Sequence, residues 1–329
     1  METIEFNYKT LCDSDYRFKN VFGEDFLKNK KFVCKNKLYS EGKPVNKEGQ
    51  MTSFSFAGDL KEIFGLEMDE RFKKKYDEAT SGSGNEGLKI QTLHSSSLLA
   101  LLVFCNVTED NPIVINKIKY VDAYFEVKNK VFNAPSNVDV VLISEDKKTV
   151  LFLESKFTEY LKTNDYKISI KYWGFYKKLN FEKLPIKISL PYLDSKGKSV
   201  FNLESRVRNK KQRQYCEGIK QLISHYIGIN NGLVEKYAKK YELSFQPIID
   251  NAGSLILGEI NYSFCESGVK YKKLYEDVAE QLNENREKLL EKGSWRKIQV
   301  LDSILTYQEV LQNNSGFNLP DTVKSFYKF

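Results

Sequence analysis

The chain has 329 residues, is 41% hydrophobic and carries a net charge of +7, which fits an ordinary globular protein or one with a polyanionic partner. Five scattered cysteines without a CxxC pair argue against a zinc or iron–sulfur site and favour reduced thiols in the cytoplasm. No apolar run reaches the ~20 residues that cross a membrane, so we expect no membrane partner.

Two regions are predicted from the composition along the chain. Residues 1–88 are rich in lysine and aromatic residues and form an N-terminal elaboration, which ends in the glycine- and serine-rich segment 80–87. Residues 89–329 are predicted to form one mixed α+β domain, a central mixed sheet flanked by helices, with an irregular insertion near 180–211.

The expected elements of this domain follow from hydrophobic periodicity and turn residues. In chain order they are a buried helix at 94–104, strands at 118–127, 137–143 and 150–156, a helix at 212–227, a buried strand at 253–264, and helices at 271–291 and 297–312.

The hairpin formed by 137–143 and 150–156 carries acidic residues where a core strand would not. If its turn is symmetric, residues whose numbers sum to 293 face each other, and Asp139 lies opposite Glu154. Side chains alternate along a strand, so Lys156 emerges on the same face as Glu154. Two facing carboxylates repel each other unless a cation neutralises them, and Mg²⁺ does so with oxygen ligands.

The spacing from Asp139 to Glu154-Ser155-Lys156 resembles that of the PD-(D/E)XK nuclease superfamily, which has the restriction-endonuclease-like fold. The resemblance implies that Asp139 and Glu154 hold Mg²⁺, for which Mn²⁺ can substitute, and that Lys156 positions the attacking water. Two features depart from the family pattern. The proline usually next to the aspartate is Pro135, four residues upstream, and the helix at 94–104 supplies no acid.

Other residues are candidates for the same site. Glu126 on the preceding strand is placed to substitute for the absent helix acid. Gln221 and His225 lie one turn apart on the helix after the hairpin, where some family branches place a glutamine and a tyrosine. A basic strip before this helix is a candidate contact to phosphates, and its members are Arg206, Arg208, Lys210, Lys211 and Arg213.

We therefore predict a cytoplasmic, metal-dependent nuclease that hydrolyses phosphodiester bonds, with double-stranded DNA as the expected partner and a homodimer as one oligomeric state. A catalytically silent nucleic-acid-binding module of the same fold is the alternative. A glycosidase with paired carboxylates is a weaker reading, because it does not need the adjacent lysine. The choice between DNA and RNA, and between endonuclease and exonuclease action, stays open.

Overall fold

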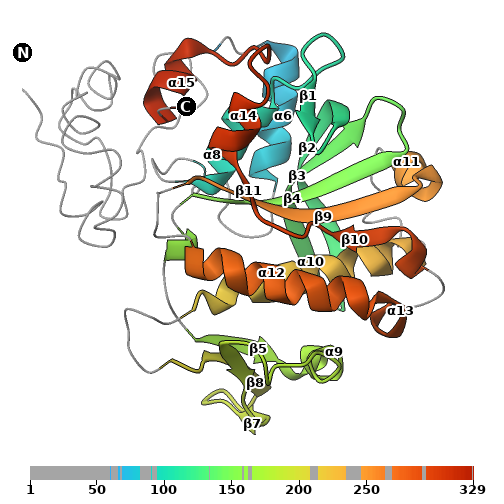
Figure 1. Ribbon diagram of the computed structural model, residues 1–329, viewed down its shortest axis with the longest axis vertical. Helices are drawn as coiled ribbons and strands as arrows, with labels where there is room; N and C mark the ends of the chain where they lie inside the picture. The colour runs from blue at the N-terminus through green and yellow to red at the C-terminus, as the bar shows by residue number, and fades with distance from the viewer. Residues whose placement is uncertain are drawn as a thin grey trace, which may run out of the picture.

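The computed structural model describes a large part of the chain (Figure 1). The described residues are 60, 66, 69–81, 90, 95–132, 134–157, 159–161, 165–207, 214–234, 246–263, 269–290, 294–327 and 329. Most of the N-terminal elaboration predicted at 1–88 lies outside them, and its longest described segment holds helix α6 (Glu70–Thr80).

A mixed sheet forms the centre of the molecule. Its strands are β1 (Ile113–Ile115), β2 (Ile118–Val131), β3 (Ala134–Ser144), β4 (Thr149–Lys156), β9 (Ser254–Asn261), β10 (Ile298–Val300) and β11 (Leu305–Thr306). Strands β1 to β4 pair antiparallel in chain order, whereas β9 runs parallel to β4 and both β10 and β11 run parallel to β9. The predicted mixed α+β class is therefore confirmed.

Helices cover both faces of this sheet (Figure 1). On one face lie α6, α8 (Ser96–Phe104) and α14 (Tyr307–Gln312), and on the other lie α10 (Cys216–Val234), α12 (Val269–Glu284) and the short α13 (Arg286–Leu289). Two further short helices, α11 (Gln246–Asn251) and α15 (Asp321–Tyr327), flank the sheet. No helix in the described part of the chain has the length and apolarity that crossing a membrane requires.

The two layers explain the composition of the central strands. Strands β4 and β9 are buried along nearly their whole length because both of their faces are covered, so they are almost continuously apolar. Helix α10 lies close to β2 at Gly228, where an added Cβ would come within 2.8 Å of the Asn129 Cβ. Any larger residue at position 228 would push this helix, and the side chains it presents, away from the sheet.

A second, smaller sheet is formed by the segment between β4 and α10. It contains β5 (Tyr166–Ser169), β6 (Ile186–Ile188), β7 (Tyr192–Leu193) and β8 (Ser199–Ser205), with the short helix α9 (Trp173–Tyr176) beside it. In Figure 1 this sheet lies below α12, on the side of that helix away from the central sheet. The insertion that we expected to be irregular near 180–211 thus holds strands β6, β7 and β8.

The prediction of a helix at 297–312 is partly wrong. The segment 297–312 is helical only from Tyr307, and its first half forms β10 and β11. Ile298, Leu301 and Leu305 are spaced as on one face of a helix, but Ile298 instead pairs with Leu255 of β9. The other predicted strands and helices are found, with ends that differ by several residues from the expected ones.

Candidate active site

The hairpin of β3 and β4 has the predicted register. The pairs Val140–Leu153 and Ile143–Val150 both obey the expected sum, and continuing the ladder by one residue brings Asp139 opposite Glu154. The backbone N–H of Ser155 donates to Oδ2 of Asp139 at 2.7 Å, so this carboxylate is held against the end of β4.

The same row of the sheet holds two more acids. The β2–β3 pairs on either side of Glu126 place it opposite Asp139, and the β4–β9 register pairs Glu154 with Glu259. Residues opposite one another in a sheet project from the same face. Four adjacent strands therefore each contribute one acid, and we call Glu126, Asp139, Glu154 and Glu259 the carboxylate row.

Glu126 has an unusual backbone conformation for a residue within a strand. Its φ of 47° lies in the left-handed region, which a side chain with a Cβ rarely adopts and which costs of order 1–3 kcal/mol. Its side chain is buried, and the Asn137 amide donates to its Oε2 at 3.0 Å. Strained backbone of this kind concentrates at functional sites, which supports a role for Glu126 beside Asp139.

Glu154 is the most heavily contacted member of the row. Its Oε1 accepts from Nζ of Lys156 at 2.5 Å and from Nε2 of Gln221 at 2.7 Å, and its Oε2 contacts Nε2 of His225 at 2.8 Å. Glu154, Lys156 and His225 are all buried, whereas Gln221 is half-buried. The turn of α10 that carries Gln221 and His225 therefore lies against the end of β4.

The orientation of His225 is fixed from its far side. Its Nδ1 lies 2.8 Å from the Oγ of Ser136 on β3. Because an ionised carboxylate only accepts hydrogen bonds, Nε2 of His225 must donate to Glu154. In the neutral imidazole Nδ1 is then the acceptor, so the Ser136 hydroxyl donates to it.

The neighbours of Glu154 decide its ionisation. Burial alone would raise its pKa, but the charge of Lys156 and the contacts of His225 outweigh burial and lower the pKa to about 2. Burial likewise opposes the charge on Lys156, and Glu154, Tyr215 and Asp139 together raise the pKa of this ammonium well above its ordinary value. A buried carboxylate and a buried ammonium thus stay ionised together at neutral pH.

The other acids of the row experience the opposite balance. Burial, reinforced by the charges of Glu154 and Glu126, raises the pKa of Asp139 well above its ordinary value. Burial also raises the pKa of Glu259 to about 7. The Tyr271 hydroxyl donates to its Oε2 at 2.7 Å, and Gly218 at the start of α10 leaves the space that this tyrosine occupies. The acids of the carboxylate row therefore outnumber the cations that neutralise them.

Of the residues predicted for the site, Asp139, Glu154, Lys156, Gln221 and Glu126 lie together at the carboxylate row. The basic strip does not join them where it is described. The guanidinium of Arg206 donates to three backbone carbonyls of the insertion, those of Phe181, Leu184 and Ile186. Its remaining members, Arg208, Lys210, Lys211 and Arg213, lie outside the described residues.

Sequence reasoning missed two residues of this site. Glu259 is a lone acid within the apolar run of β9, and this pattern is a signal that could have identified it. Ser136 had no signal, because a serine near a strand start is ordinary. Its role depends on α10 crossing β3, which local sequence does not specify.

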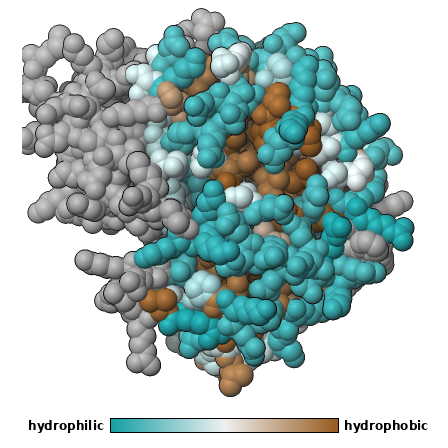
Figure 2. Space-filling view, in the orientation of Figure 1, coloured by the Kyte–Doolittle hydropathy of each residue, from teal (hydrophilic) through white to brown (hydrophobic). Residues whose placement is uncertain are grey.

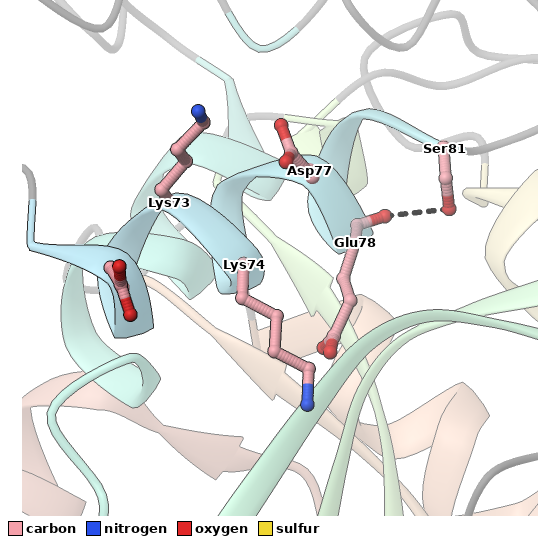
Figure 3. A pocket seen from close by; sticks show the side chains of 6 residues that line it. Lys73, Lys74, Asp77, Glu78 and Ser81 are labelled. Atoms are coloured by element: carbon pink, nitrogen blue, oxygen red, sulfur yellow. Dashed lines mark hydrogen bonds between the residues drawn. The ribbon is translucent and has the colours of Figure 1, made fainter.

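A hollow of about 480 Å³ on the surface of α6 offers a contrast (Figure 3). It is lined by Glu70, Lys73, Lys74, Asp77, Glu78 and Ser81. Figure 3 shows the side chains of Lys73 and Asp77 on one side of the helix and those of Lys74 and Glu78 on the other, with the Ser81 hydroxyl bonded to the Glu78 carbonyl. Charges that do not converge do not make a site.

The carboxylate row offers hard oxygen ligands beside the buried ammonium of Lys156. Among the described residues no group of three histidine, cysteine, aspartate or glutamate side chains is arranged to hold a metal ion by itself. No protein-family model, curated protein or solved structure matches this chain.

Proposed function

We propose that this protein is a metal-dependent nuclease of the PD-(D/E)XK kind, which hydrolyses phosphodiester bonds in double-stranded DNA. The observation that carries the proposal is the carboxylate row with Lys156 bonded into it. The register that brings Asp139 opposite Glu154, and the bond from Lys156 to Glu154, support the resemblance. Glu126, on the neighbouring strand, supplies the further acid that the helix α8 lacks.

The residues of the row fit Mg²⁺. Asp139 is half-buried, it is not engaged by any of the donors that hold Glu154, and its neighbours are acidic, so a cation beside it would relieve their repulsion. Mg²⁺ is commonly held by one or two carboxylates, with waters and substrate phosphate completing the shell, so Asp139 and Glu154 suffice. Bound there, the ion would polarise the phosphate and lower the pKa of a bound water.

The chain's own residues then have distinct tasks. Lys156 stays protonated in its buried position, so it can orient the attacking water and stabilise the negative charge that develops on the phosphate oxygens. Gln221 and His225 hold Glu154 in one orientation, and Ser136 fixes the tautomer of His225. This arrangement sets the geometry before substrate binds.

The proposal includes a cytoplasmic location and a homodimer. Cys105 is a buried free thiol, which supports a location in the reducing cytoplasm. A homodimer would supply a second carboxylate row for the second strand of a duplex.

A silent nucleic-acid-binding module remains the alternative. The observation in its favour is that Lys156, Gln221 and His225 already satisfy Glu154 without a metal. Such a module would bind duplex DNA equally well in EDTA and in Mg²⁺, and it would show no turnover.

A second candidate function rests on the chain of contacts from Ser136 through His225 to Glu154. A serine hydroxyl that donates to a histidine, which in turn donates to a carboxylate, is the arrangement of a nucleophilic triad. It ranks second because Glu154 also binds Lys156, and because the triad leaves Asp139 and Glu126 without a task.

The test is cleavage of supercoiled plasmid and linear duplex in Mg²⁺ or Mn²⁺. We expect wild type to nick or degrade DNA, and Lys156→Ala and Asp139→Asn each to lower the rate by about 10³-fold. Ser136→Ala should lower the rate by only about tenfold, because Ser136 acts through His225 and Glu154. Lys119→Ala, which removes an exposed ion pair with Glu145, is the matched control.

Three results would count against the proposal. Equal rates for wild type and Lys156→Ala would refute the assigned site. Binding without turnover in either metal would favour the silent module. Hydrolysis of a chromogenic ester that is lost in Ser136→Ala, without any DNA cleavage, would favour the triad.

A further inference from the structure

The small sheet ends in an exposed apolar cluster. Large hydrophobic side chains are exposed at four places in the described chain, and three of these fall within four consecutive positions. Leu190 is 81% exposed, Leu193 is 68% exposed and Tyr192 is 39% exposed; we call these three residues the apolar tip. In Figure 2 brown atoms mark the lower end of the molecule, where Figure 1 places β7. Exposed apolar residues gathered in this way indicate a binding surface.

The apolar tip is braced by hydrogen bonds. The Tyr192 hydroxyl donates to Oδ1 of Asn202 at 2.7 Å, and the backbone N–H of Ser189 donates to the Asn202 carbonyl at 2.9 Å. In the turn beyond, Oδ1 of Asp194 accepts from the backbone N–H groups of Lys196 and Lys198, each at 2.9 Å. The backbone that carries the tip is therefore fixed before binding, so it has little conformational entropy left to lose.

The segment that carries the apolar tip is rich in positive charge. Residues 165–207 contain nine lysines and arginines against four acids, so this segment supplies +5 of the chain's +7. Two of the acids are already paired, Asp194 with Lys167 and Glu204 with Lys187. Lys196 and Lys198 are exposed on the turn and make no ion pair with any described residue. An apolar projection beside two exposed lysines, in a segment with a net charge of +5, fits a polyanion with an apolar interior, such as stacked bases between phosphates.

Helix α10 connects this small sheet to the carboxylate row. It packs against β5 and β8, and its Ser224 hydroxyl donates to the Tyr172 hydroxyl at 3.2 Å. Lys220 lies 6.0 Å from the ring centroids of both Tyr166 and Tyr172. The next residue, Gln221, bonds Glu154. A duplex bound by the small sheet would therefore be bound by a part of the protein that packs against α10, the helix that contacts the carboxylate row.

We propose that the apolar tip is a wedge that enters the minor groove of duplex DNA and separates two stacked base pairs. The lysines around it hold the flanking phosphates. The choice of a duplex as the substrate rests on the proposed nuclease function. Side chains such as leucine commonly act in this way, and the kink they produce bends the duplex toward its major groove, away from the inserted side chains.

The experiment uses the full chain in EDTA, so that binding is measured without cleavage. Duplexes with 2-aminopurine at successive positions report unstacking by a rise in fluorescence, and anisotropy gives the affinity. We expect wild type to raise the fluorescence at one or two positions. The double variant Leu190→Ser/Leu193→Ser should lose this rise and bind about tenfold more weakly. Val114→Ser is the matched control, because Val114 is the remaining exposed hydrophobic residue, 42% exposed, and lies on β1.

The outcomes separate this proposal from the nuclease proposal. A fluorescence rise that the double variant loses supports the wedge, even if no metal restores cleavage. Equal affinity and equal fluorescence for the double variant and wild type overturn the wedge, even if wild type cleaves DNA. Binding to phosphatidylserine vesicles that the double variant loses, with DNA binding unchanged, also overturns it and assigns the tip to an anionic membrane surface.

Discussion

The two sheets of this protein depart from the usual distribution of side chains in opposite directions. The central sheet buries charge, with Glu154, Lys156 and Glu259 all less than 6% exposed. The small sheet exposes hydrophobic side chains that could have been polar at no cost to its hairpin. Neither arrangement maximises the free energy of unfolding, because burying a charge and exposing a leucine both give less stability than the reverse.

The difference between the sheets shows how each departure is tolerated. The buried charges of the central sheet persist because they neutralise and hydrogen-bond one another, so each depends on its partners. Leu190 and Leu193 of the small sheet make no such interactions through their side chains, and hydrogen bonds of other residues in the hairpin hold their backbone in place. We therefore expect substitutions in the carboxylate row to change stability strongly, and substitutions of Leu190 and Leu193 in the apolar tip to change it hardly at all.

The largest expected effect is that of Lys156→Met. Removing the ammonium leaves Glu154 buried between two other acids, and breaking a buried ion pair in this way costs about 3–5 kcal/mol of unfolding free energy. Urea denaturation followed by circular dichroism measures it. Lys119→Met breaks the exposed pair with Glu145 and should cost less than about 1 kcal/mol.

The double variant Glu154→Gln/Lys156→Met sharpens this prediction. With the carboxylate neutralised as well, no uncompensated charge is left buried, and we expect part of the lost stability to return. If the double variant is less stable than Lys156→Met, the interaction of the two charges is not what supports the row.

The next effect concerns Glu259 and pH. Its pKa is raised from 4.5 to about 7, so between these values the folded state holds a proton that the unfolded state has released. Stability must then fall as pH rises through this window, by roughly 3 kcal/mol at 1.36 kcal/mol for each pKa unit. Glu259→Gln cannot ionise, so its unfolding free energy, measured in EDTA, should lack this loss between pH 5 and pH 8. Parallel pH profiles for the two proteins would contradict the prediction.

A smaller effect is expected for Ser136→Ala. The substitution removes the hydroxyl that donates to Nδ1 of His225 and leaves this buried nitrogen without its partner, at a cost of about 1–2 kcal/mol. Thermal unfolding measures the change. Ser81→Ala removes an exposed hydroxyl that donates to a helix carbonyl and should change stability by less than about 0.5 kcal/mol. Equal losses for both variants would mean that Ser136 is not part of the network.

The β3–β4 register could be predicted from the sequence because it depends on a short connection. The turn at Asp146 and Lys147 joins two apolar runs that pair only one way without exposing their cores, so Asp139 and Glu154 had to face each other. Lys156 followed from alternation alone. The helix with Gln221 was predicted from its periodicity, and its position over Glu154 is a result of the fold.

The remaining features depend on contacts that span the chain. Glu259 faces Glu154 because β9 runs parallel to β4 after a crossover of about a hundred residues, and local sequence does not set that register. The strands of the small sheet span two to seven residues, too few for periodicity to be visible. The apolar tip was missed for the same reason, since exposure of Leu190 and Leu193 is a property of the folded hairpin.

The smallest expected effect is that of Leu190→Ser/Leu193→Ser on stability. Both side chains are mainly exposed in the folded state, so little apolar surface returns to water when they are replaced. The hydrogen bonds of Tyr192, Ser189 and Asp194 that brace the hairpin remain. We expect the unfolding free energy to change by less than about 0.5 kcal/mol in urea. Tyr192→Phe, which removes only the bond to Asn202, should cost more than the double variant, because it loosens the scaffold that presents the tip. The reverse order would mean that the two leucines support the hairpin itself, and the contrast between the two sheets would then fail.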